Sequence, residues 1–330
     1  MKQDLVWKEY LSDDERYADI INGVCFGGRQ AVSGKQLQPY SPQGHTAVRP
    51  ADRRKKKERP AGNHGENTRD TVRLVVTGRG CLVAGIETRA EPDYAMPLRI
   101  MCHDAGTYGK NASGIRRETR KSPEGLSPGE YLYGFRRESR LYPVITIVLY
   151  TGREWDGPRS LHGILDFTGL PEGTESLVPD YGLRLVEIRR LEDTGVFRTD
   201  VRRVSDFIRY ADDKEKLREL TAGDPYYASM EEDAYEVAAV CTDAAGLLRV
   251  RDHHRKKGKT DMCRAIEEMV AEGKAEGIRE GKAEGIREGK AEGIRGTVSV
   301  LRDLDIPVQT ILFQIQKEYG LSLEESRRYL

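Results

Sequence analysis

Two short stretches decide the fold of this chain: RDTVRLVV at residues 69–76 and CLVAGIETR at residues 81–89, joined by TGRG at residues 77–80. Two strand-like runs with a glycine-containing connection are typical of a β-hairpin, with Gly78 and Arg79 as its two-residue loop. If Thr77 pairs with Gly80, every other cross-strand pair follows from the chain numbering. The pair at the open end of this hairpin is then Asp70 and Glu87.

This register predicts that the carboxylates of Asp70 and Glu87 face each other, with Cβ atoms roughly 4.5–5.5 Å apart. Arg89 follows Glu87 by two residues, so it shares the same face of the strand. Two acids that can share a divalent cation, with a positive charge beside them, are typical of a metal-dependent phosphodiesterase site. The same pattern also fits two solvated surface acids, and a three-residue loop would put the two carboxylates out of line.

The overall charge gives no evidence for a nucleic-acid partner, because lysine plus arginine and aspartate plus glutamate both number 54 among the 330 residues. Local charge is more informative. Basic residues outnumber acidic ones by nine to four over residues 49–73, by five to one over 110–121 and by six to one over 249–259. These runs could contact phosphates, although solvated loops are the more usual explanation for any one of them.

Cysteine spacing and apolar runs indicate a cytoplasmic protein. The five cysteines are odd in number, widely spaced and without a CxxC pair, which supports neither a disulfide framework nor a zinc site. The first seventeen residues lack the apolar core of a signal peptide. The longest apolar run, at residues 142–150, is too short to cross a bilayer, so we expect no membrane partner.

Strands and helices alternate from Asp13 to Leu220, which predicts one mixed α/β domain within residues 1–250. A capping box at residues 12–15 predicts a helix over 13–24. Residues 27–67 read as an irregular basic insertion, and residues 110–131 as a polar, basic loop. A further helix is expected after Pro92, with a buried stripe formed by Tyr94, Leu98, Met101, Ala105 and Tyr108.

Two apolar stretches complete the predicted sheet. YPVITIVLY at residues 142–150 is rich in β-branched residues, as expected of a strand that is buried on both faces. LRLVEIRRL at residues 183–191 resembles another strand. Between them, WDGPRSLHGILDF at residues 155–167 predicts a turn that leads into a short helix.

The C-terminal part carries the repeat KAEGIREG, at residues 274–281 and 282–289, followed by KAEGIRG at 290–296. Glycine at every fourth position costs about 1 kcal/mol per residue in a helix, and an eight-residue step drifts by about 80°, which excludes a continuous coiled-coil seam. We interpret residues 251–296 as a charged, frayed helical spacer and residues 297–330 as a tail of short helices. The sharper alternative is a homo-oligomer that forms through the repeat helix.

Several segments together resemble a known family. They are LSDDERYADIINGV at residues 11–24, GIETRAEPDYAMPLRI at 85–100, YPVITIVLYTGREWDGPRSLHGILDF at 142–167 and YGLRLVEIRRLED at 181–193. With the EGI repeats, they are similar to the recombination-promoting nuclease and transposase-like group of the PD-(D/E)XK nuclease superfamily. The resemblance covers most of residues 10–220.

The resemblance implies a restriction-endonuclease-like core, in which helices flank a central mixed sheet, and Mg²⁺-dependent hydrolysis of DNA. Asp70 matches the metal-binding aspartate of the family, and Glu87 the glutamate of its E-x-K/Q motif. Arg89 occupies the last position of that motif, where lysine or glutamine is usual. Asp19, on the first helix, is a weaker candidate for an accessory acid. A planar guanidinium keeps its positive charge but cannot release a proton, so Arg89 departs from the pattern in a way that would lower activity.

DNA is therefore the expected partner and Mg²⁺ the expected cofactor. The residues expected to hold the DNA backbone lie in the second basic run: Arg116, Arg117, Arg120 and Lys121. Two other interpretations stay open at this point. One is a DNA-binding protein of the same fold without catalysis, and the other is an interaction protein that functions through its repeat tail.

Overall fold

The structure is a computed structural model, and it describes residues 3–40, 71–78 and 80–330. The chain divides into two compact units, Met1–Cys263 (unit 1) and Arg264–Leu330 (unit 2), and each is described by itself. Among the described residues, no helix is both long and apolar enough to cross a membrane.

Unit 1 is built around a mixed five-stranded sheet in which the strands follow their order along the chain. Strands β1 (Leu37–Pro39), β2 (Thr71–Val76) and β3 (Cys81–Arg89) form an antiparallel meander. Strands β4 (Val144–Tyr150) and β5 (Arg184–Glu187) then add parallel to β3. The expected mixed α/β class is therefore confirmed, with β3 and β4 in the middle of the sheet.

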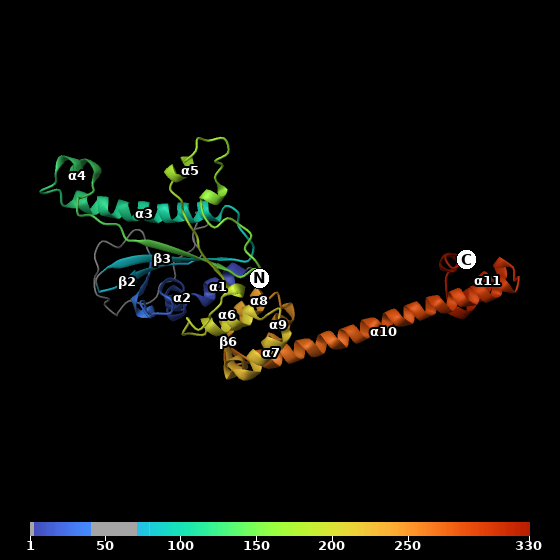
Figure 1. The fold of residues 1–330 in the computed structure, drawn as a ribbon. Coiled ribbons are helices and arrows are strands. Elements are labelled where there is room, and N and C mark those ends of the chain that lie inside the picture. Colours follow the sequence, from blue (N-terminus) through green and yellow to red (C-terminus); the bar gives the residue numbers. More distant parts are fainter. Residues whose placement is uncertain (1–2, 41–70, 79) are drawn as a thin grey trace. The chain divides into compact units, whose positions relative to one another are not determined.

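Helices cover both faces of this sheet. Helix α3 (Met96–Lys121) lies on one side, and α1 (Gln3–Tyr10) and α2 (Asp14–Phe26) lie on the other (Figure 1). Side chains alternate between the two faces along a strand, so Glu87 of β3 points toward α3 whereas Ile86 points toward the other side. Both faces of β3 are buried, as the apolar run of the strand requires.

Helix α2 begins and ends where local chemistry dictates. Asp13 caps its N-terminus, because the carboxylate accepts hydrogen bonds from the backbone N–H groups of Glu15 and Arg16. Gly27 ends the helix in the left-handed conformation, with φ of 60°. The expected helix over 13–24 is therefore present, but its cap is Asp13 and it extends to Phe26.

Helix α1 is fixed against α8 (Glu232–Cys241), and its Val6, Trp7 and Tyr10 are buried. The indole Nε1 of Trp7 donates a hydrogen bond to Sγ of Cys241 at 3.2 Å. Residues far apart in the chain thus build one core beneath the sheet, to which α6 (Val201–Arg209) contributes Val204, Phe207 and Ile208.

Three expectations for local structure were wrong. The predicted loop over 110–131 is largely helix, because α3 runs without interruption to Lys121 and α4 (Pro128–Tyr133) follows. The strand predicted at 183–191 is shorter: β5 ends at Glu187 and Ile188–Arg190 form a 3₁₀ turn. The helix predicted near residue 160 is only a 3₁₀ turn, His162–Ile164.

The predicted insertion over 27–67 is ordered at its start, where Gly34–Gln36 form a 3₁₀ turn that leads into β1; its remainder from residue 41 lies outside the described residues. The basic run at 249–259 contributes β7 (Arg255–Lys256) and β8 (Lys259–Thr260) to a small three-stranded sheet, whose third strand is β6 (Met230–Glu231). The remaining helices of unit 1 are short: α5 (Thr174–Leu177), α7 (Lys214–Gly223) and α9 (Ala245–Val250).

Unit 2 consists of the repeat helix and a small helical cluster. Helix α10 (Met262–Asp303) begins at the end of unit 1 and continues for 42 residues, through every repeat glycine and past the expected end of the spacer at residue 296. Its last turns pack against α11 (Val308–Tyr319) and α12 (Leu323–Arg327). The buried centre of this cluster consists of Ile294, Val298, Ile311 and Ile315.

Candidate functional site

The β2–β3 hairpin has the register that the sequence predicts. The Cα partners run from Thr71 opposite Ile86 to Val76 opposite Cys81. The loop is closed by Thr77, whose N–H donates to the carbonyl oxygen of Gly80 at 2.9 Å and whose Oγ1 accepts from the Gly80 N–H at 3.0 Å. Asp70 and Arg79 lie outside the described residues, so the predicted pairing is confirmed as far as Thr71 and Ile86.

Glu87 lies near the end of the central strand β3 and is only 1 % exposed. Its Oε2 accepts a hydrogen bond from Nη2 of Arg89 at 2.9 Å, within an ion pair along the same strand face. Its Oε1 lies 2.9 Å from Nδ1 of His103 on helix α3. A buried carboxylate is costly unless it is paired, so these two contacts account for how the charge is accommodated at this point of the sheet.

The face of α3 that meets the sheet is polar in its middle, and this differs from the predicted stripe. Tyr94 precedes the helix and is 61 % exposed, and Leu98 is 43 % exposed. The side chains that are buried in the first half of α3 are instead Met96, Pro97, Ile100, His103, Asp104 and Thr107. The sequence interpretation followed apolar residues alone and therefore missed His103 and Asp104.

Asp104 builds a second polar contact between α3 and the sheet, and it is 3 % exposed. Its Oδ1 accepts a hydrogen bond from Oγ1 of Thr146 at 2.6 Å, and its Oδ2 accepts one from the hydroxyl of Tyr181. These residues line a cavity of about 650 Å³ beside strand β5. Asp104 and His103 are adjacent, so α3 is tied to β3 and to β4 by neighbouring residues.

The residues predicted to bind DNA lie on the second half of α3, not on a loop. Arg116, Arg117, Arg120 and Lys121 are all exposed, and Lys121 forms an ion pair with Glu118 at 2.7 Å. Arg116 is thirteen residues beyond His103, which corresponds to roughly 20 Å along a helix. The structure therefore does not bring these basic residues together with Glu87.

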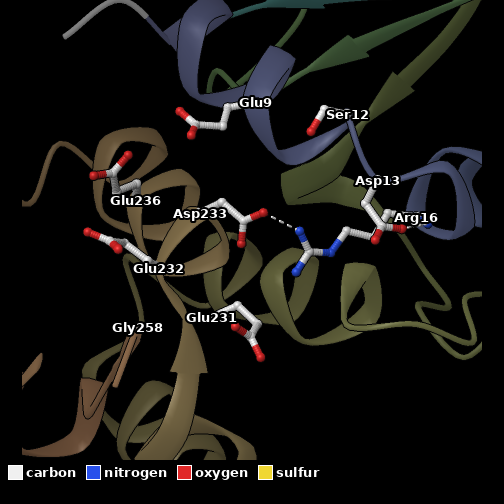
Figure 2. Close-up of a pocket in the computed structure, with 9 residues that line it drawn as sticks. All are labelled: Glu9, Ser12, Asp13, Arg16, Glu231, Glu232, Asp233, Glu236 and Gly258. Atoms are coloured by element: carbon white, nitrogen blue, oxygen red, sulfur yellow. Dashed lines mark hydrogen bonds and ion pairs between the residues drawn. The ribbon is translucent and has the colours of Figure 1, made fainter. Parts of the chain in front are cut away.

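A cavity of about 820 Å³ in unit 1 is strongly acidic, and no sequence motif indicated it. Figure 2 shows its lining, in which Arg16 faces acidic side chains from two parts of the chain; the lining residues are Glu9, Ser12, Asp13, Arg16, Glu231, Glu232, Asp233, Glu236 and Gly258. Basic residues pair with several of these acids, including Arg255 with Glu232 at 2.7 Å and Lys259 with Glu231 at 3.0 Å. This cavity would repel a phosphate backbone.

Electrostatics within this cavity follow from the crowding of like charges. Burial raises the pKa of Glu236, and the neighbouring Glu9, Glu232 and Asp233 raise it further, while Arg251 acts in the opposite direction. These contacts join α1, α8 and the small β6–β8–β7 sheet. The arrangement is accounted for by ion pairing within the fold.

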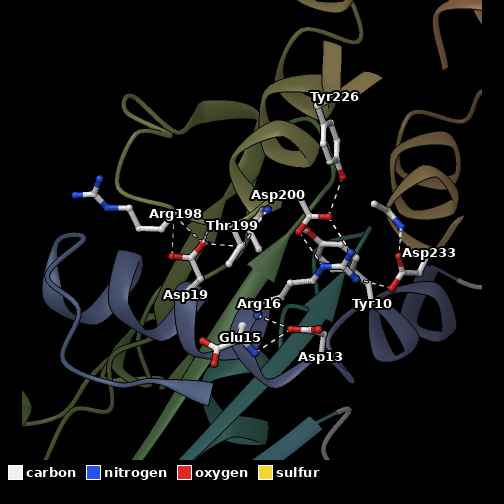
Figure 3. Close-up of polar contacts among 12 residues, drawn as sticks. Tyr10, Asp13, Glu15, Arg16, Asp19, Arg198, Thr199, Asp200, Tyr226 and Asp233 are labelled. Carbon is white, nitrogen blue, oxygen red and sulfur yellow. Dashed lines mark hydrogen bonds and ion pairs between the residues drawn. The ribbon is translucent and has the colours of Figure 1, made fainter. Parts of the chain in front are cut away.

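Arg16 is the centre of a buried network that Figure 3 shows. Its Nε and Nη2 donate to the two carboxylate oxygens of Asp200, each at 2.8 Å, and its Nη1 donates to Oδ2 of Asp233 at 2.5 Å. Tyr10 and Tyr226 also donate to Asp200, at 3.1 and 2.8 Å. Burial raises the pKa of both tyrosines and the Asp200 carboxylate raises it further, so both hydroxyls stay protonated as donors.

Asp19, the predicted accessory acid, is engaged elsewhere in the fold. It is 3 % exposed, and its carboxylate accepts hydrogen bonds from the N–H groups of Arg198 and Thr199 and from Oγ1 of Thr199, at 2.6–2.9 Å (Figure 3). Asp19 therefore holds the segment before α6 against α2. Its contacts explain its burial without a role in chemistry.

The side chains around Glu87 provide only part of what a Mg²⁺ site needs. No group of three or more His, Cys, Asp or Glu side chains with metal-binding geometry exists among residues 3–40, 71–78 and 80–330. Mg²⁺ usually keeps several waters and takes only one or two carboxylates from the protein. By chemical type, Glu87 with Asp70 would satisfy that requirement, and His103 would orient Glu87 from behind.

No family model, no curated protein and no solved structure matches this chain.

Proposed function

We propose that this chain is a Mg²⁺-dependent DNA endonuclease whose reacting groups are Asp70, Glu87 and Arg89. The observation that carries the proposal is the buried Glu87 carboxylate on the central strand, held between Arg89 and His103. The hairpin register supports it, because one more pair in the same register would place Asp70 opposite Glu87. A mixed sheet with helices on both faces also agrees with the fold that the sequence resemblance implies.

Asp70 and Glu87 would hold the metal through carboxylate oxygens, the ligands that Mg²⁺ prefers. When bound, Mg²⁺ would polarise a phosphodiester oxygen and lower the pKa of a bound water.

The protein's own side chains have defined tasks in this proposal. His103 fixes the direction of Oε1 of Glu87 across the interface between α3 and β3. Arg89 is half-buried, and its guanidinium lies beside Oε2. It would stabilise the negative charge that develops on the phosphate in the transition state.

The contact between Arg89 and Glu87 favours a second candidate function. Nη2 of Arg89 donates a hydrogen bond to Oε2 of Glu87 at 2.9 Å. A metal ion bound by Glu87 would need this same oxygen as a ligand. A guanidinium also cannot accept the proton of an attacking water. The alternative is therefore a catalytically impaired member of the same fold that binds DNA without cutting it.

Plasmid cleavage by the purified full chain tests the proposal. We expect supercoiled DNA to be nicked with Mg²⁺ or Mn²⁺ and to stay intact with a chelator. Asp70→Asn and Glu87→Gln should abolish cleavage, whereas Glu192→Gln, at an exposed acid, should leave it unchanged. Cleavage by Glu87→Gln at the wild-type rate would refute the proposal.

The alternative predicts a different result. The wild-type protein would then bind DNA in a salt-sensitive manner but cut with neither cation. Arg89→Lys separates the two cases further, because a gain of cleavage in this variant would show that the guanidinium itself blocks the site.

A further inference from the structure

The second half of α3 extends beyond the strand on which the first half packs. Tyr108 and Asn111 make its last hydrogen bonds near β4, to the backbone N–H groups of Val144 and Tyr142. In the following ten residues of α3, only Thr119 is buried. This part of the helix spans about 15 Å and, with α4 and the segment that follows it, forms a feature that we name the α3–α4 arm, residues 112–140 (Figure 1).

The arm is held in shape by local contacts. Ser127 and Glu130 form a capping box at the start of α4, and Gly134 ends α4 with φ of 64°. The Gly134 backbone lies so close to α3 that a Cβ there would be 3.4 Å from Cβ of Arg116. The guanidinium of Arg136 donates to the carbonyl oxygen of Ser122 at 2.7 Å. The arm is thus a defined hairpin of helices, although it has little core of its own.

The tip of the arm exposes three consecutive large side chains. Tyr131, Leu132 and Tyr133 of α4 are 70 %, 67 % and 70 % exposed. Successive side chains of a helix point about 100° apart, so these three spread around α4, and each is available to a partner at the tip. No packing within the described part of the chain accounts for these three.

The charge around this tip indicates which kind of partner fits. Residues 112–140 contain seven basic and four acidic residues. Glu118 is paired with Lys121 and Glu130 is used in the capping box, while Glu124 and Glu138 are exposed, so basic residues outnumber the exposed acids on the arm. Exposed aromatic rings among arginines are the combination with which proteins bind single-stranded nucleic acid, through base stacking and phosphate contacts.

We infer that the α3–α4 arm binds single-stranded DNA, with Arg116 and Arg120 on the phosphates and the rings of Tyr131 and Tyr133 stacked on unpaired bases. This inference rests on the proposed function for its choice of DNA. Arg116 is about 20 Å along α3 from the residue that contacts Glu87.

Binding of the full-length protein in the presence of a chelator tests the inference, because no cleavage can occur. The probe is a fluorescently labelled 20-nucleotide single strand, compared with a 20-base-pair duplex by anisotropy. Tyr131→Ala with Tyr133→Ala should raise Kd for the single strand at least about 5-fold, since one stacked base contributes about 1–3 kcal/mol. The matched pair Tyr131→Phe with Tyr133→Phe keeps both rings and should bind like the wild type.

Salt dependence tests the arginines separately. Arg116→Gln with Arg120→Gln should reduce the slope of log K against log salt by about 1.4, which is 0.7 for each lost contact with a single strand. Lys214→Gln removes an exposed positive charge from α7 and should leave the slope unchanged. Circular dichroism melting of each variant verifies that the protein is folded.

Each outcome has a defined meaning. The inference would be overturned if the alanine pair bound single-stranded DNA with wild-type affinity. It would also be overturned if the wild-type protein bound no single-stranded DNA, and a protein would then be the expected partner of the arm. Weakened binding in the alanine pair, when neither protein cuts with Mg²⁺, would support the arm and refute the endonuclease. Weakened binding in the alanine pair, together with a Glu87→Gln variant that binds the single strand normally but does not cut, would support both proposals.

Discussion

Oε1 of Glu87 on strand β3 lies 2.9 Å from Nδ1 of His103 on helix α3, and both side chains are almost completely buried. The two atoms are at ion-pair distance, and the contact joins the central strand to the helix that covers it.

The pair should therefore show energetic coupling. His103→Gln should lower the free energy of unfolding by about 1–3 kcal/mol, because a buried carboxylate oxygen loses a partner. A double-mutant cycle of His103→Gln and Glu87→Gln in urea should give a coupling energy above about 0.5 kcal/mol. Strictly additive effects would show that the two side chains do not interact in solution.

The network around Arg16 should contribute more to stability than any surface ion pair. Arg16→Met leaves the half-buried carboxylates of Asp200 and Asp233 without their guanidinium partner, and we expect a loss of about 3 kcal/mol. Arg198→Met is the matched control, since the Arg198 side chain is exposed and should change stability by less than about 0.5 kcal/mol. Equal midpoints of urea unfolding for the two variants would contradict this prediction.

We expect Asp19 to contribute to the stability of the fold. Asp19→Ala removes the acceptor for two backbone N–H groups and should cost about 2 kcal/mol or more in unfolding free energy. Asp14→Ala, which breaks an exposed pair with Arg73 at 3.2 Å, should cost no more than about 1 kcal/mol. If Asp19→Ala unfolds like the wild type, the carboxylate is not needed to hold the segment before α6 and the accessory role in catalysis regains weight.

The capping box of α4 should keep its acid ionised far below the usual range. Hydrogen bonds from the backbone N–H groups of Arg137 and Ser127 lower the pKa of Glu130 to about 2. A group with a depressed pKa stabilises the folded form above its ordinary pKa of 4.5, and this contribution is lost as the pH falls through about 2. Carboxyl ¹³C titration by NMR should give a midpoint near 2 for Glu130, and a midpoint near 4.5 would show that the box is open.

Thiol chemistry should distinguish the cysteines under native conditions. Burial raises the pKa of Cys241 to about 12, and burial also raises the pKa of Cys25 and of Cys81. Cys102 is exposed on α3. With an aromatic disulfide reagent at pH 8, Cys102 should react first and Cys241 should stay unmodified until the protein is unfolded. Loss of the fast phase in Cys102→Ser verifies the assignment, and a fast phase that survives would contradict it.

The hairpin could be predicted from the sequence because its information is local. Glycine in a short loop sets the pairing, and the alternation of the strands then decides which face each residue takes. The same reasoning predicts β4, because a continuous run of β-branched residues between turn residues is typical of a buried strand. The burial of Glu87 between β3 and α3 could not be read in this way, since it depends on His103.

The polar contacts of α3 could not be predicted, because hydrophobic periodicity carries no signal for a buried histidine or aspartate. His103 and Asp104 are buried since each has a partner on the sheet, and those partners lie 16 and 42 residues away in the chain. The burial of Asp19 has the same origin, with partners 179 and 180 residues away. The second half of α3 is helical although its high charge predicts a loop, because arginine and lysine also favour a helix.

The position of the indole of Trp7, packed beneath the sheet beside Cys241, has a practical consequence. The chain has two tryptophans, Trp7 and Trp155, and both belong to unit 1, where they are 1 % and 5 % exposed. Their emission will therefore follow the unfolding of unit 1 alone, while ellipticity at 222 nm also includes the 42 residues of α10. Recording both signals in one titration will show whether the glycine-rich helix melts together with the sheet or before it.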